Sequence, residues 1–325
     1  MAKNANLHNA KTAKNDEFYT QLSDIEKEMR YYKDFFKGKV VYCNCDDARE
    51  SNFFKYFSMN FEHLGLKKLI TTGYKENGKG VVLVYEGDKN SNRKVDDSEI
   101  VVTELQGNGD FRSDECIEYL KQADVVVTNP PFSLFRQYVK QLMDYGKKFI
   151  VIGNFNAIND IGIFPYFKDN KMWLGVSKRS MDFILPNKEK SRVNACWYTN
   201  VDNKRRNEKI DLFKKYNEKE FPGYENYNAI EVSRVENIPM DYDGVMGVPI
   251  TFLEKYNPNQ FEIVGKTENR DLYSLKTRVY TNQECKDAYF AKFKKEGLYD
   301  LNASGVLIKG GLREKTYARI LIRRK

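Results

Sequence analysis

The sequence contains very little histidine and no long apolar segment. Only two of its 325 residues are histidine, His8 and His63, and His8 lies in a polar stretch near the N-terminus. Catalytic triads and many metal sites depend on histidine, so we expect neither a histidine-based triad nor a metal centre. No segment approaches the ~20 apolar residues that span a bilayer, and there is no apolar N-terminal signal. These absences predict a cytoplasmic protein.

Cysteine is also sparse and lacks a recognisable spacing. The cysteines are odd in number and scattered, at Cys43, Cys45, Cys116, Cys196 and Cys285. This pattern fits neither a zinc site nor a disulfide framework. We therefore expect reduced thiols in a reducing compartment.

Basic side chains outnumber acidic ones. The chain carries 54 basic and 46 acidic residues, a net charge of +8, and residues 201–325 hold 24 of the basic and 19 of the acidic ones. Basic clusters occur at Lys204–Arg206, Lys214–Lys215, Lys292–Lys295 and Arg323–Lys325. Any single cluster is most often a solvated surface. Together with an aromatic content of 14%, the clusters favour a polyanionic partner.

Apolar strand-like segments alternate with amphipathic helical segments in the first two hundred residues. Strands are predicted near residues 39–45, 69–72, 99–105, 124–128, 148–153, 172–176 and 194–201, and helices near residues 23–36, 51–64, 113–122 and 134–145, with Ser113 as an N-cap. Residues 81–85 also form a strand, which we interpret as a hairpin insertion outside the core. Such alternation predicts an α/β fold with a parallel sheet covered on both sides.

The pattern changes near residue 203. Beyond it the charge rises, the periodicity weakens, and segments such as Tyr242–Pro249 resemble irregular structure with turns. Residues 1–202 are expected to form one domain, which begins with a loose basic arm over residues 1–15. Residues 203–325 are expected to form a second region.

The most informative segment is Asp124–Phe132, which reads Asp-Val-Val-Val-Thr-Asn-Pro-Pro-Phe. Three consecutive valines indicate a strand that is buried on both faces. The strand ends at Asn129 because each following proline fixes its own φ and lacks an N–H donor. The segment predicts a stiff turn at the carboxyl end of a central strand, where open α/β sheets bind their ligands.

The groups in this turn suit one kind of chemistry. Asn129 offers an amide oxygen, Pro130 a rigid carbonyl and Phe132 a flat ring, and none of them is a general base of useful pKa. Two acceptors facing one planar amino group would hold both of its N–H bonds and aim its lone pair at an electrophile. The turn therefore favours transfer of a group onto the exocyclic amine of a base. The alternative is a purely structural turn with Phe132 in the core.

Six segments carry a family resemblance that covers nearly the whole chain. They are Asp16–Thr20, Val40–Asp47, Ser51–Phe57, Gly109–Ser113, Val126–Phe135 and Asp243–Leu253. Together they resemble DNA adenine methyltransferases that use S-adenosylmethionine, and most closely the EcoRI-type modification methyltransferases of type II restriction–modification systems. The last segment lies outside the general methyltransferase motifs and therefore points to this subfamily.

The resemblance implies a Rossmann-like class I methyltransferase fold with a mostly parallel seven-stranded sheet and a C-terminal target-recognition region. Residues 1–202 would bind S-adenosylmethionine and catalyse the transfer, and residues 203–325 would recognise DNA. In such enzymes one segment contacts the methionine end of the cofactor, one turn carries its nucleoside and an Asp-Phe pair holds its adenine. These positions correspond here to Tyr19 and Thr20, to Cys43, Asn44, Cys45 and Asp46, and to Asp110 and Phe111.

The cofactor turn departs from the family pattern. It contains no Gly-x-Gly. A carboxylate that binds the ribose normally ends the second strand, but this chain has Thr71, Thr72 and Tyr74 there. Asp46 and Asp47 are both candidates for the missing carboxylate.

The implied reaction is methyl transfer to the amino group of a flipped-out adenine in double-stranded DNA, which protects the DNA from a restriction nuclease. Its catalytic residues would be Asn129, Pro130, Pro131 and Phe132. We expect a monomer that acts beside a separately encoded cognate nuclease. Two alternatives stay open: a methyltransferase that acts on RNA or on a protein glutamine, and a non-catalytic DNA-binding module on a degenerate methyltransferase fold.

Overall fold

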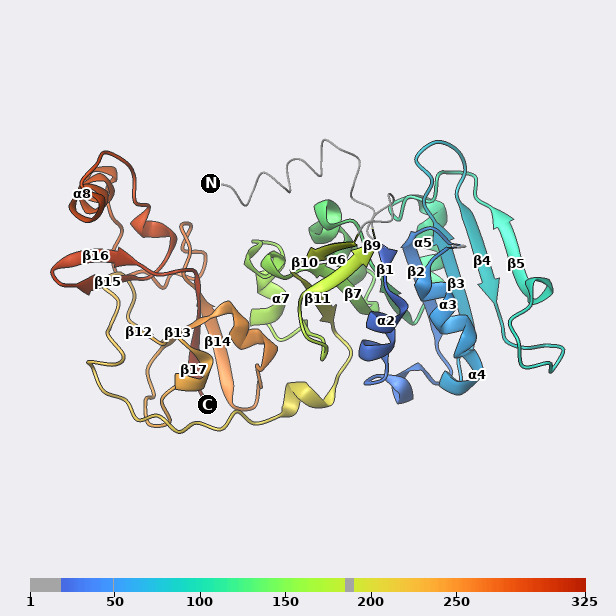
Figure 1. The fold of residues 1–325 in the computed structure, drawn as a ribbon, viewed down its shortest axis with the longest axis horizontal. Helices are drawn as coiled ribbons and strands as arrows, with labels where there is room; N and C mark the ends of the chain where they lie inside the picture. The colour runs from blue at the N-terminus through green and yellow to red at the C-terminus, as the bar shows by residue number, and fades with distance from the viewer. Residues whose placement is uncertain (1–18, 49, 185–189) are drawn as a thin grey trace. The chain divides into compact units, whose positions relative to one another are not determined.

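The computed structural model describes residues 19–48, 50–184 and 190–325. The chain divides into two compact units (Figure 1). The first comprises residues up to Tyr166 together with Lys171–Asn203, and the second comprises Phe167–Asn170 together with Lys204–Lys325. The arm expected over residues 1–15 lies outside the described residues.

An eight-stranded sheet forms the centre of the first unit (Figure 1), in the order β5-β4-β3-β2-β6-β7-β11-β8. Its strands are β2 (Val40–Asp46), β3 (Lys68–Gly73), β4 (Val81–Tyr85), β5 (Ile100–Glu104), β6 (Val125–Thr128), β7 (Lys148–Asn154), β8 (Trp173–Leu174) and β11 (Ala195–Thr199). Their pairings give six strands one direction, whereas β4 and β11 run opposite. The mostly parallel α/β fold predicted from the sequence is therefore confirmed.

The sheet has one strand more than the seven expected because β4 belongs to it. The interpretation of residues 81–85 as a hairpin insertion outside the core is wrong. β4 pairs antiparallel with both β3 and β5, and Val82, Leu83 and Tyr85 are buried. The segment Val-Val-Leu-Val-Tyr is rich in β-branched and aromatic residues, which pack well against neighbours on a pleated surface. The glycines around it form the turns without keeping the strand out of the sheet.

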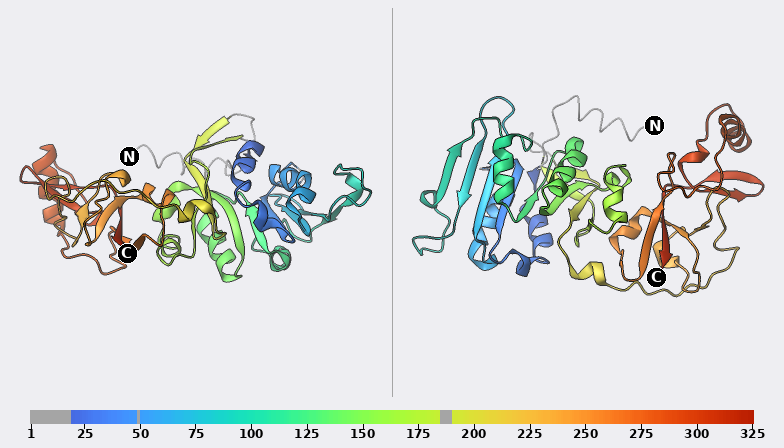
Figure 2. Two further views of the ribbon diagram at one scale, coloured as in Figure 1. Left: turned by 90° about the horizontal axis from the view of Figure 1, so that it is seen from below. Right: turned by 180° about the vertical axis from the view of Figure 1, so that it is seen from behind.

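Helices cover both faces of this sheet (Figure 2). The helices of the first unit are α2 (Leu22–Met29), α3 (Asn52–Met59), α4 (Phe61–Leu64), α5 (Asp114–Gln122) and α6 (Phe135–Asp144), and its short 3-10 helices are η1 (Lys33–Phe36), η2 (Asp97–Glu99), η3 (Phe132–Leu134) and η4 (Phe155–Asn159). The division between the units falls within α7 (Phe164–Lys168). Residues from α2, α3 and α4 share one buried core with Val125 and Val127 of β6. The Ser113 side chain accepts a hydrogen bond from the Cys116 N–H, so the predicted N-cap of α5 is confirmed.

Two helices are shorter than the sequence predicted. The expected helix over residues 23–36 ends at Met29, and residues 33–36 form the separate η1. The two consecutive tyrosines at positions 31 and 32, which have low helix propensity, lie at this break. The expected helix over residues 51–64 is interrupted at Asn60, whose side-chain amide donates to the Tyr56 carbonyl at 2.8 Å. Such local side-chain bonds compete with the backbone bonds of a helix.

A small three-stranded sheet joins distant parts of the first unit. β9 (Met181–Ile184) lies between β1 (Tyr19–Thr20) and β10 (Lys190–Val193), and both neighbours are antiparallel to it. The pairing places Thr20 opposite Phe183. This sheet therefore brings the N-terminal segment beside residues more than 150 positions later in the chain.

The second unit contains a four-stranded sheet and a separate two-stranded one (Figure 1). The larger sheet has the order β12-β13-β17-β14, and the smaller sheet pairs β15 with β16. The elements of this unit are η5 (Lys204–Asn207), β12 (Ile230–Glu231), η6 (Val235–Asn237), β13 (Met246–Pro249), η7 (Ile250–Glu254), β14 (Phe261–Lys266), α8 (Asn282–Phe293), η8 (Leu301–Ala303), β15 (Val306–Lys309), β16 (Leu312–Lys315) and β17 (Arg319–Arg324).

The expectation that Tyr242–Pro249 is irregular throughout is wrong. Its second half is the strand β13, which lies between β12 and β17 and buries Met246 and Val248. The strand is short and contains Gly247, so its sequence shows almost no period-two pattern. A tertiary partner stabilises it where the local signal is weak. In the described part of the chain, no helix combines the length and the apolar character needed to cross a membrane.

Candidate active site

The Asn129–Phe132 turn lies where the strand order of the large sheet reverses. The chain passes from β2 to β3 on one side and later from β6 to β7 on the other. The carboxyl ends of β2 and β6 therefore lie at a topological switch point, where open α/β sheets bind ligands. Asn129 and Pro130 are buried directly after β6, whereas Pro131 and Phe132 are partly exposed. The structure thus places the predicted catalytic turn at the ligand-binding edge of the sheet.

Asn44, near the carboxyl end of β2, is bound to elements on both sides of this turn. Its backbone carbonyl accepts a hydrogen bond from the hydroxyl of Thr128, the last residue of β6. Its side-chain oxygen accepts a hydrogen bond from the hydroxyl of Tyr138 in α6. All three residues are buried. Asn44 therefore joins the predicted cofactor turn to the predicted catalytic turn.

Tyr138 extends this connection to the loop that follows β5. Its ring packs edge-on against Phe111, with 4.9 Å between the ring centroids. Gln141, one turn further along α6, donates to the Phe111 carbonyl at 3.1 Å. Burial raises the pKa of Tyr138 well above its usual value, so its hydroxyl remains protonated and can donate to Asn44. The sequence reasoning missed Tyr138, although its place one turn into the helix after the catalytic turn could have pointed to it.

Asp110 is held in place by its neighbour Arg112. The guanidinium Nε lies 2.9 Å from one carboxylate oxygen of Asp110, and Nη2 lies 2.6 Å from the other. These hydrogen bonds lower the pKa of Asp110 below its ordinary value. The carboxylate is therefore ionised at neutral pH, and each oxygen keeps a further lone pair with which to accept from an amino group. Arg112 also lies over the Phe111 ring, 5.4 Å from its centroid.

The glycine-free turn adopts a backbone conformation that glycine usually supplies. Cys45 has a φ of 69°, in the left-handed region. Cys43 is opposite Thr71 and Asp46 is opposite Gly73, so β2 contains one residue more than β3 over this stretch. Such a bulge bends the strand locally. For a residue other than glycine the left-handed conformation costs on the order of 1 kcal/mol. The side chain of Asp46 lies outside the described residues.

The segment after β3 approaches the Asp110 loop very closely. Gly109 has a φ of +82°, and a Cβ at this position would collide with the Gly73 carbonyl oxygen. The Lys75 N–H donates to the Asn108 carbonyl at 2.8 Å. The hydroxyl of Thr72, just before Gly73, lies 2.7 Å from that of Tyr42. These contacts fix the Asp110 loop against the end of β3.

Thr20 connects the N-terminal segment to the same region. It pairs with Phe183, whose ring packs edge-on against Phe132 with 6.2 Å between centroids. The backbone carbonyl of Thr20 accepts a hydrogen bond from the side chain of Asn52, at the start of α3, at 2.8 Å. Within the described residues the buried Thr20 hydroxyl has no hydrogen-bond partner. Tyr19 pairs with β9 through its backbone, and its side chain lies outside the described residues.

Comparison with known proteins identifies the family of this chain. Residues 6–325 match the family described as adenine-specific methyltransferase EcoRI. The chain belongs to this family. It is 48% identical to the type II methyltransferase M.EcoRI of Escherichia coli, over 81% of this chain and 90% of that protein.

Two relatives from Mycoplasma agree with this assignment. The chain is 40% identical to the type II methyltransferase M.MgeORF184P of Mycoplasma genitalium, over 84% of this chain and 90% of the relative. It is 37% identical to the type II methyltransferase M.MpnI of Mycoplasma pneumoniae, over 89% of this chain and 95% of the relative. The EcoRI-type adenine-specific methyltransferase predicted from the sequence is therefore confirmed, as is its place among methyltransferases of restriction–modification systems. The non-catalytic module and the RNA or glutamine methyltransferase are not favoured.

The roles of individual residues in this EcoRI-family methyltransferase stay predictions. The structure gathers Thr20, Asn44, Phe111 and Phe132 through the contacts described above, although they are far apart in the sequence. Of the residues that join them, Thr128 lies in the Val126–Phe135 segment, whereas Tyr138 belongs to none of the six segments. Their contribution became visible only with the packing of α6 against the loops.

Proposed function

We propose that this protein transfers a methyl group from S-adenosylmethionine to the exocyclic amino group of a flipped-out adenine in double-stranded DNA. The observation that carries the proposal is the position of the Asn129–Phe132 turn at the sheet's switch point, joined through Asn44 and Tyr138 to Phe111. Residues proposed for the cofactor and for the target base thus belong to one connected cluster.

The cofactor residues fit S-adenosylmethionine by their chemistry. Asp110 is ionised and can accept from the adenine amino group of the cofactor, and the apolar Phe111 ring beside it can pack against that adenine. The partnerless Thr20 hydroxyl is suited to the polar methionine end, since a buried polar group left unpaired costs free energy. We assign Tyr19 to the same end, and Cys43, Asn44, Cys45 and Asp46 to the nucleoside. When bound, the cofactor supplies an electrophilic methyl group on a positively charged sulfur.

The catalytic turn holds the amine of the target base. The Asn129 side-chain oxygen and the Pro130 carbonyl each accept one N–H bond, which keeps the nitrogen lone pair out of conjugation with the ring. Phe132 stacks on the flipped base, and Pro131 stiffens the backbone between them. The reaction needs alignment of the reacting atoms more than it needs a general base. Flipping the adenine out of the duplex costs a few kcal/mol.

The remaining parts of the proposal concern partners. We assign DNA recognition to the second unit because of its excess of basic residues. We further propose that the protein acts as a monomer in the cytoplasm, beside a separately encoded restriction nuclease against which its methylation protects.

Replacing one acceptor of the amine tests the proposed function. With S-adenosylmethionine carrying a labelled methyl group, the Asn129→Ala variant is expected to lose methylation of genomic DNA by at least a hundredfold and to keep the wild-type cofactor affinity in calorimetry. Asp110→Ala is the complementary variant, and we expect it to bind the cofactor at least tenfold more weakly.

Each outcome tests one assignment: the role of Asn129, the role of Asp110 or the substrate. Full methylation by Asn129→Ala would remove Asn129 from the catalytic turn. An unchanged cofactor affinity in Asp110→Ala would remove Asp110 from the cofactor site. If the wild-type protein methylates RNA or protein but no DNA, the proposed substrate is wrong.

A further inference from the structure

The strands β15 and β16 form a narrow ribbon with an open tip. They pair as a two-stranded sheet, with Lys309 opposite Leu312. The two residues between them, Gly310 and Gly311, both have positive φ, at 57° and 77°, as the tight two-residue turns of twisted hairpins require. A Cβ at either glycine would meet nothing within 4 Å. The tip therefore has open space around it.

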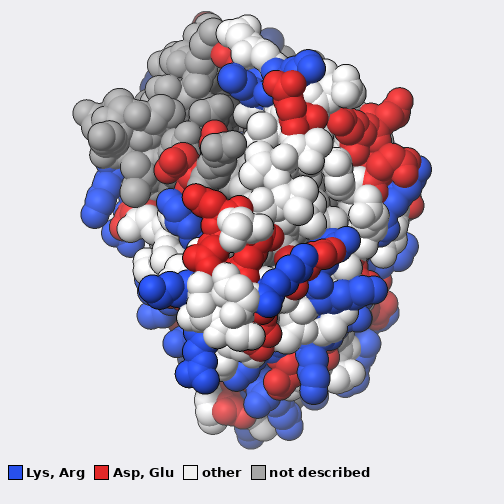
Figure 3. Space-filling view, turned by 90° about the vertical axis from the view of Figure 1, so that its right-hand side faces the viewer, with Lys and Arg blue, Asp and Glu red and all other residues white. Residues whose placement is uncertain are grey.

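The ribbon lies within the most basic segment of the chain. Residues 290–325 contain ten basic and three acidic side chains, a net charge of +7, against +8 for the whole chain. The face of the molecule in Figure 3, by contrast, intersperses basic and acidic side chains. Three of its arginines pair with Glu225, Glu231 and Glu262 outside the segment, and the positive charge that remains attracts a polyanion over long range.

One face of the ribbon is fixed to the rest of the second unit. Val306 belongs to a buried cluster with Tyr280 and Leu301. Arg313 donates two hydrogen bonds to Glu225, at 2.9 and 3.0 Å, and these bonds lower the pKa of Glu225. An isolated two-stranded sheet is marginal in water, so these contacts keep the ribbon in one position. Arg313 thus has a structural role.

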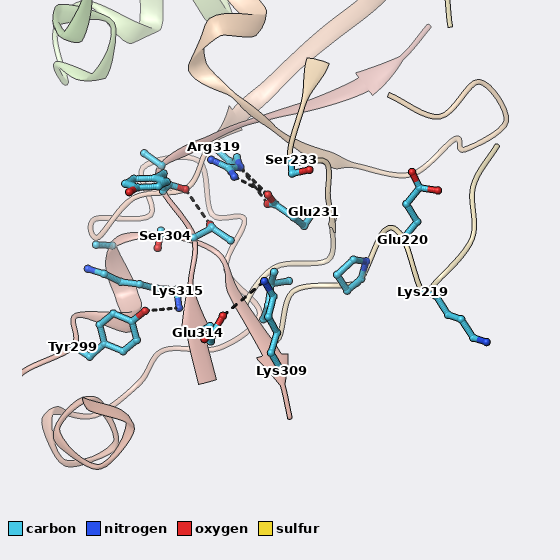
Figure 4. A pocket seen from close by; sticks show the side chains of 16 residues that line it. Lys219, Glu220, Glu231, Ser233, Tyr299, Ser304, Lys309, Glu314, Lys315 and Arg319 are labelled. Atoms are coloured by element: carbon cyan, nitrogen blue, oxygen red, sulfur yellow. Dashed lines mark hydrogen bonds and ion pairs between the residues drawn. The ribbon is translucent and has the colours of Figure 1, made fainter. Parts of the chain in front are cut away.

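The other face of the ribbon borders a groove of about 940 Å³ (Figure 4). Leu307, Lys309 and Glu314 line it from the ribbon, and Lys219 lines it from a distant segment. Glu314 lies 2.8 Å from Lys292 and 3.7 Å from Lys309, so two lysines balance its carboxylate. Lys219 has no ion-pair partner among the described residues. With four basic and three acidic side chains in its lining, the groove has an excess of one positive charge.

Large apolar side chains are exposed on the ribbon and in the groove lining. Ile308 is 53% exposed, Leu312 is 39% exposed, and Tyr317 in the groove lining is 87% exposed. Exposed apolar side chains grouped among basic ones are typical of a binding surface. This combination matches a DNA groove. Phosphates at the edges of the groove can pair with basic side chains, and thymine methyl groups at its floor can contact apolar ones.

We propose that the β15–β16 ribbon enters the major groove of the target DNA and determines which sequence is methylated. The major groove is about 12 Å wide and admits a two-stranded ribbon. Leu312, which shares the groove-side face with Lys309, contacts base edges, and Lys309 and Lys219 contact phosphates. This inference rests on the proposed function, since it assigns the reader of the DNA sequence to a methyltransferase that acts on duplex DNA.

The test compares base-reading and phosphate-binding variants with matched controls. The methylated sites are first mapped on genomic DNA, and kcat/KM is then measured on duplexes that carry the site or one altered base pair. Leu312→Ala is expected to lower the preference for the site about tenfold at one or two base pairs. Leu272→Ala removes a comparably exposed leucine (47%) from the same unit and is expected to keep the wild-type preference.

Salt dependence tests the phosphate contact. Lys309→Ala should weaken binding to all duplexes alike and lower the slope of log binding constant against log salt by about 0.9. Lys255→Ala, an exposed lysine that lines no part of the groove, should leave the slope unchanged. Urea unfolding followed by circular dichroism checks that the second unit of every variant is folded.

The possible results distinguish failure of the ribbon inference from failure of the proposed function. If wild-type protein methylates DNA at defined sites and the ribbon variants match their controls, the ribbon inference is overturned and the proposed function stands. If the ribbon variants lose affinity for RNA but not for duplex DNA, the inference is also overturned. A wild-type protein that methylates no DNA would overturn the proposed function itself.

Discussion

At the scale of single residues, the backbone of the cofactor turn adopts a conformation that usually requires glycine. The cofactor turn has no glycine, yet Cys45 adopts the left-handed φ that glycine would supply. The surrounding bulge in β2 and the hydrogen bonds of the neighbouring Asn44 hold this conformation. Absence of the family glycine therefore does not remove the turn. The packing around residues 43–46 compensates for the free-energy cost of the left-handed backbone at Cys45.

The hydroxyl of Tyr138 gives a test of how this turn is held. Tyr138→Phe keeps the ring that packs on Phe111 but leaves the buried side-chain oxygen of Asn44 without this donor. The expected loss of folding stability is about 1–3 kcal/mol, because an unsatisfied buried acceptor pays its desolvation cost. Urea unfolding measures this loss, and calorimetry should show weaker cofactor binding.

Tyr138 acts as a positioning residue. Its replacement should therefore lower cofactor affinity more than it lowers kcat at saturating cofactor. Tyr138→Ala also removes the contact with Phe111 and should be the weaker binder of the two variants. Wild-type stability in Tyr138→Phe would show that the bond to Asn44 contributes nothing.

At the scale of elements, the contact between the end of β3 and the Asp110 loop depends on glycine. Gly109 combines a φ of +82° with close contact to the Gly73 carbonyl, whereas Gly107, two residues earlier, has open space around it. The loop that presents Asp110 and Phe111 therefore has one position that admits no side chain and another that does.

Alanine at these two glycines should give opposite results. Gly109→Ala is expected to destabilise the protein by more than 1 kcal/mol and to weaken cofactor binding, since both strain and collision oppose the native loop. Gly107→Ala should change stability by less than about 0.5 kcal/mol, as surface substitutions usually do. Denaturation midpoints and cofactor titrations measure both effects. Equal behaviour of the two variants would contradict the loop packing described here.

At the scale of the whole molecule, each unit has its own buried interior. Glu231 of β12 and Arg319 of β17 form an ion pair in the second unit, with 2.6 Å between Arg319 Nη2 and Glu231 Oε1 and side-chain exposures of 9% and 10%. The Tyr224 hydroxyl also donates to Glu231. All residues assigned to the cofactor belong to the first unit. Damage to one interior should therefore have a limited effect on the other.

Removing the buried cation tests this separation. Arg319→Met leaves the Glu231 carboxylate buried and unpaired, which is expected to cost about 3–5 kcal/mol. DNA binding and methylation should fall sharply, whereas calorimetric affinity for the cofactor should stay within twofold of wild type.

The matched control is Arg323→Met, which breaks a pair with Glu262 that is about half exposed. Exposed pairs contribute only about 0–1 kcal/mol, so this variant should resemble the wild type. Loss of cofactor binding in Arg319→Met would show that the two units do not fold independently.

The local sequence determined the parts of the protein that depend on residues close together in the chain. The valine run and the two prolines after Asn129 specify a buried strand with a stiff turn, whatever surrounds them. The alternation of strands and helices specified the fold class, and the motifs specified the family. Elements with weak local signals, such as β13, were not predicted because a partner strand stabilises them.

The tertiary structure alone decided which of these residues meet. Phe183 connects Thr20 to Phe132, and Tyr138 connects Asn44 to Phe111. It also placed β4 inside the sheet and gave Cys45 its left-handed backbone. The physical reason is that periodicity and turn chemistry act over a few residues, whereas contacts between distant segments depend on how whole elements pack.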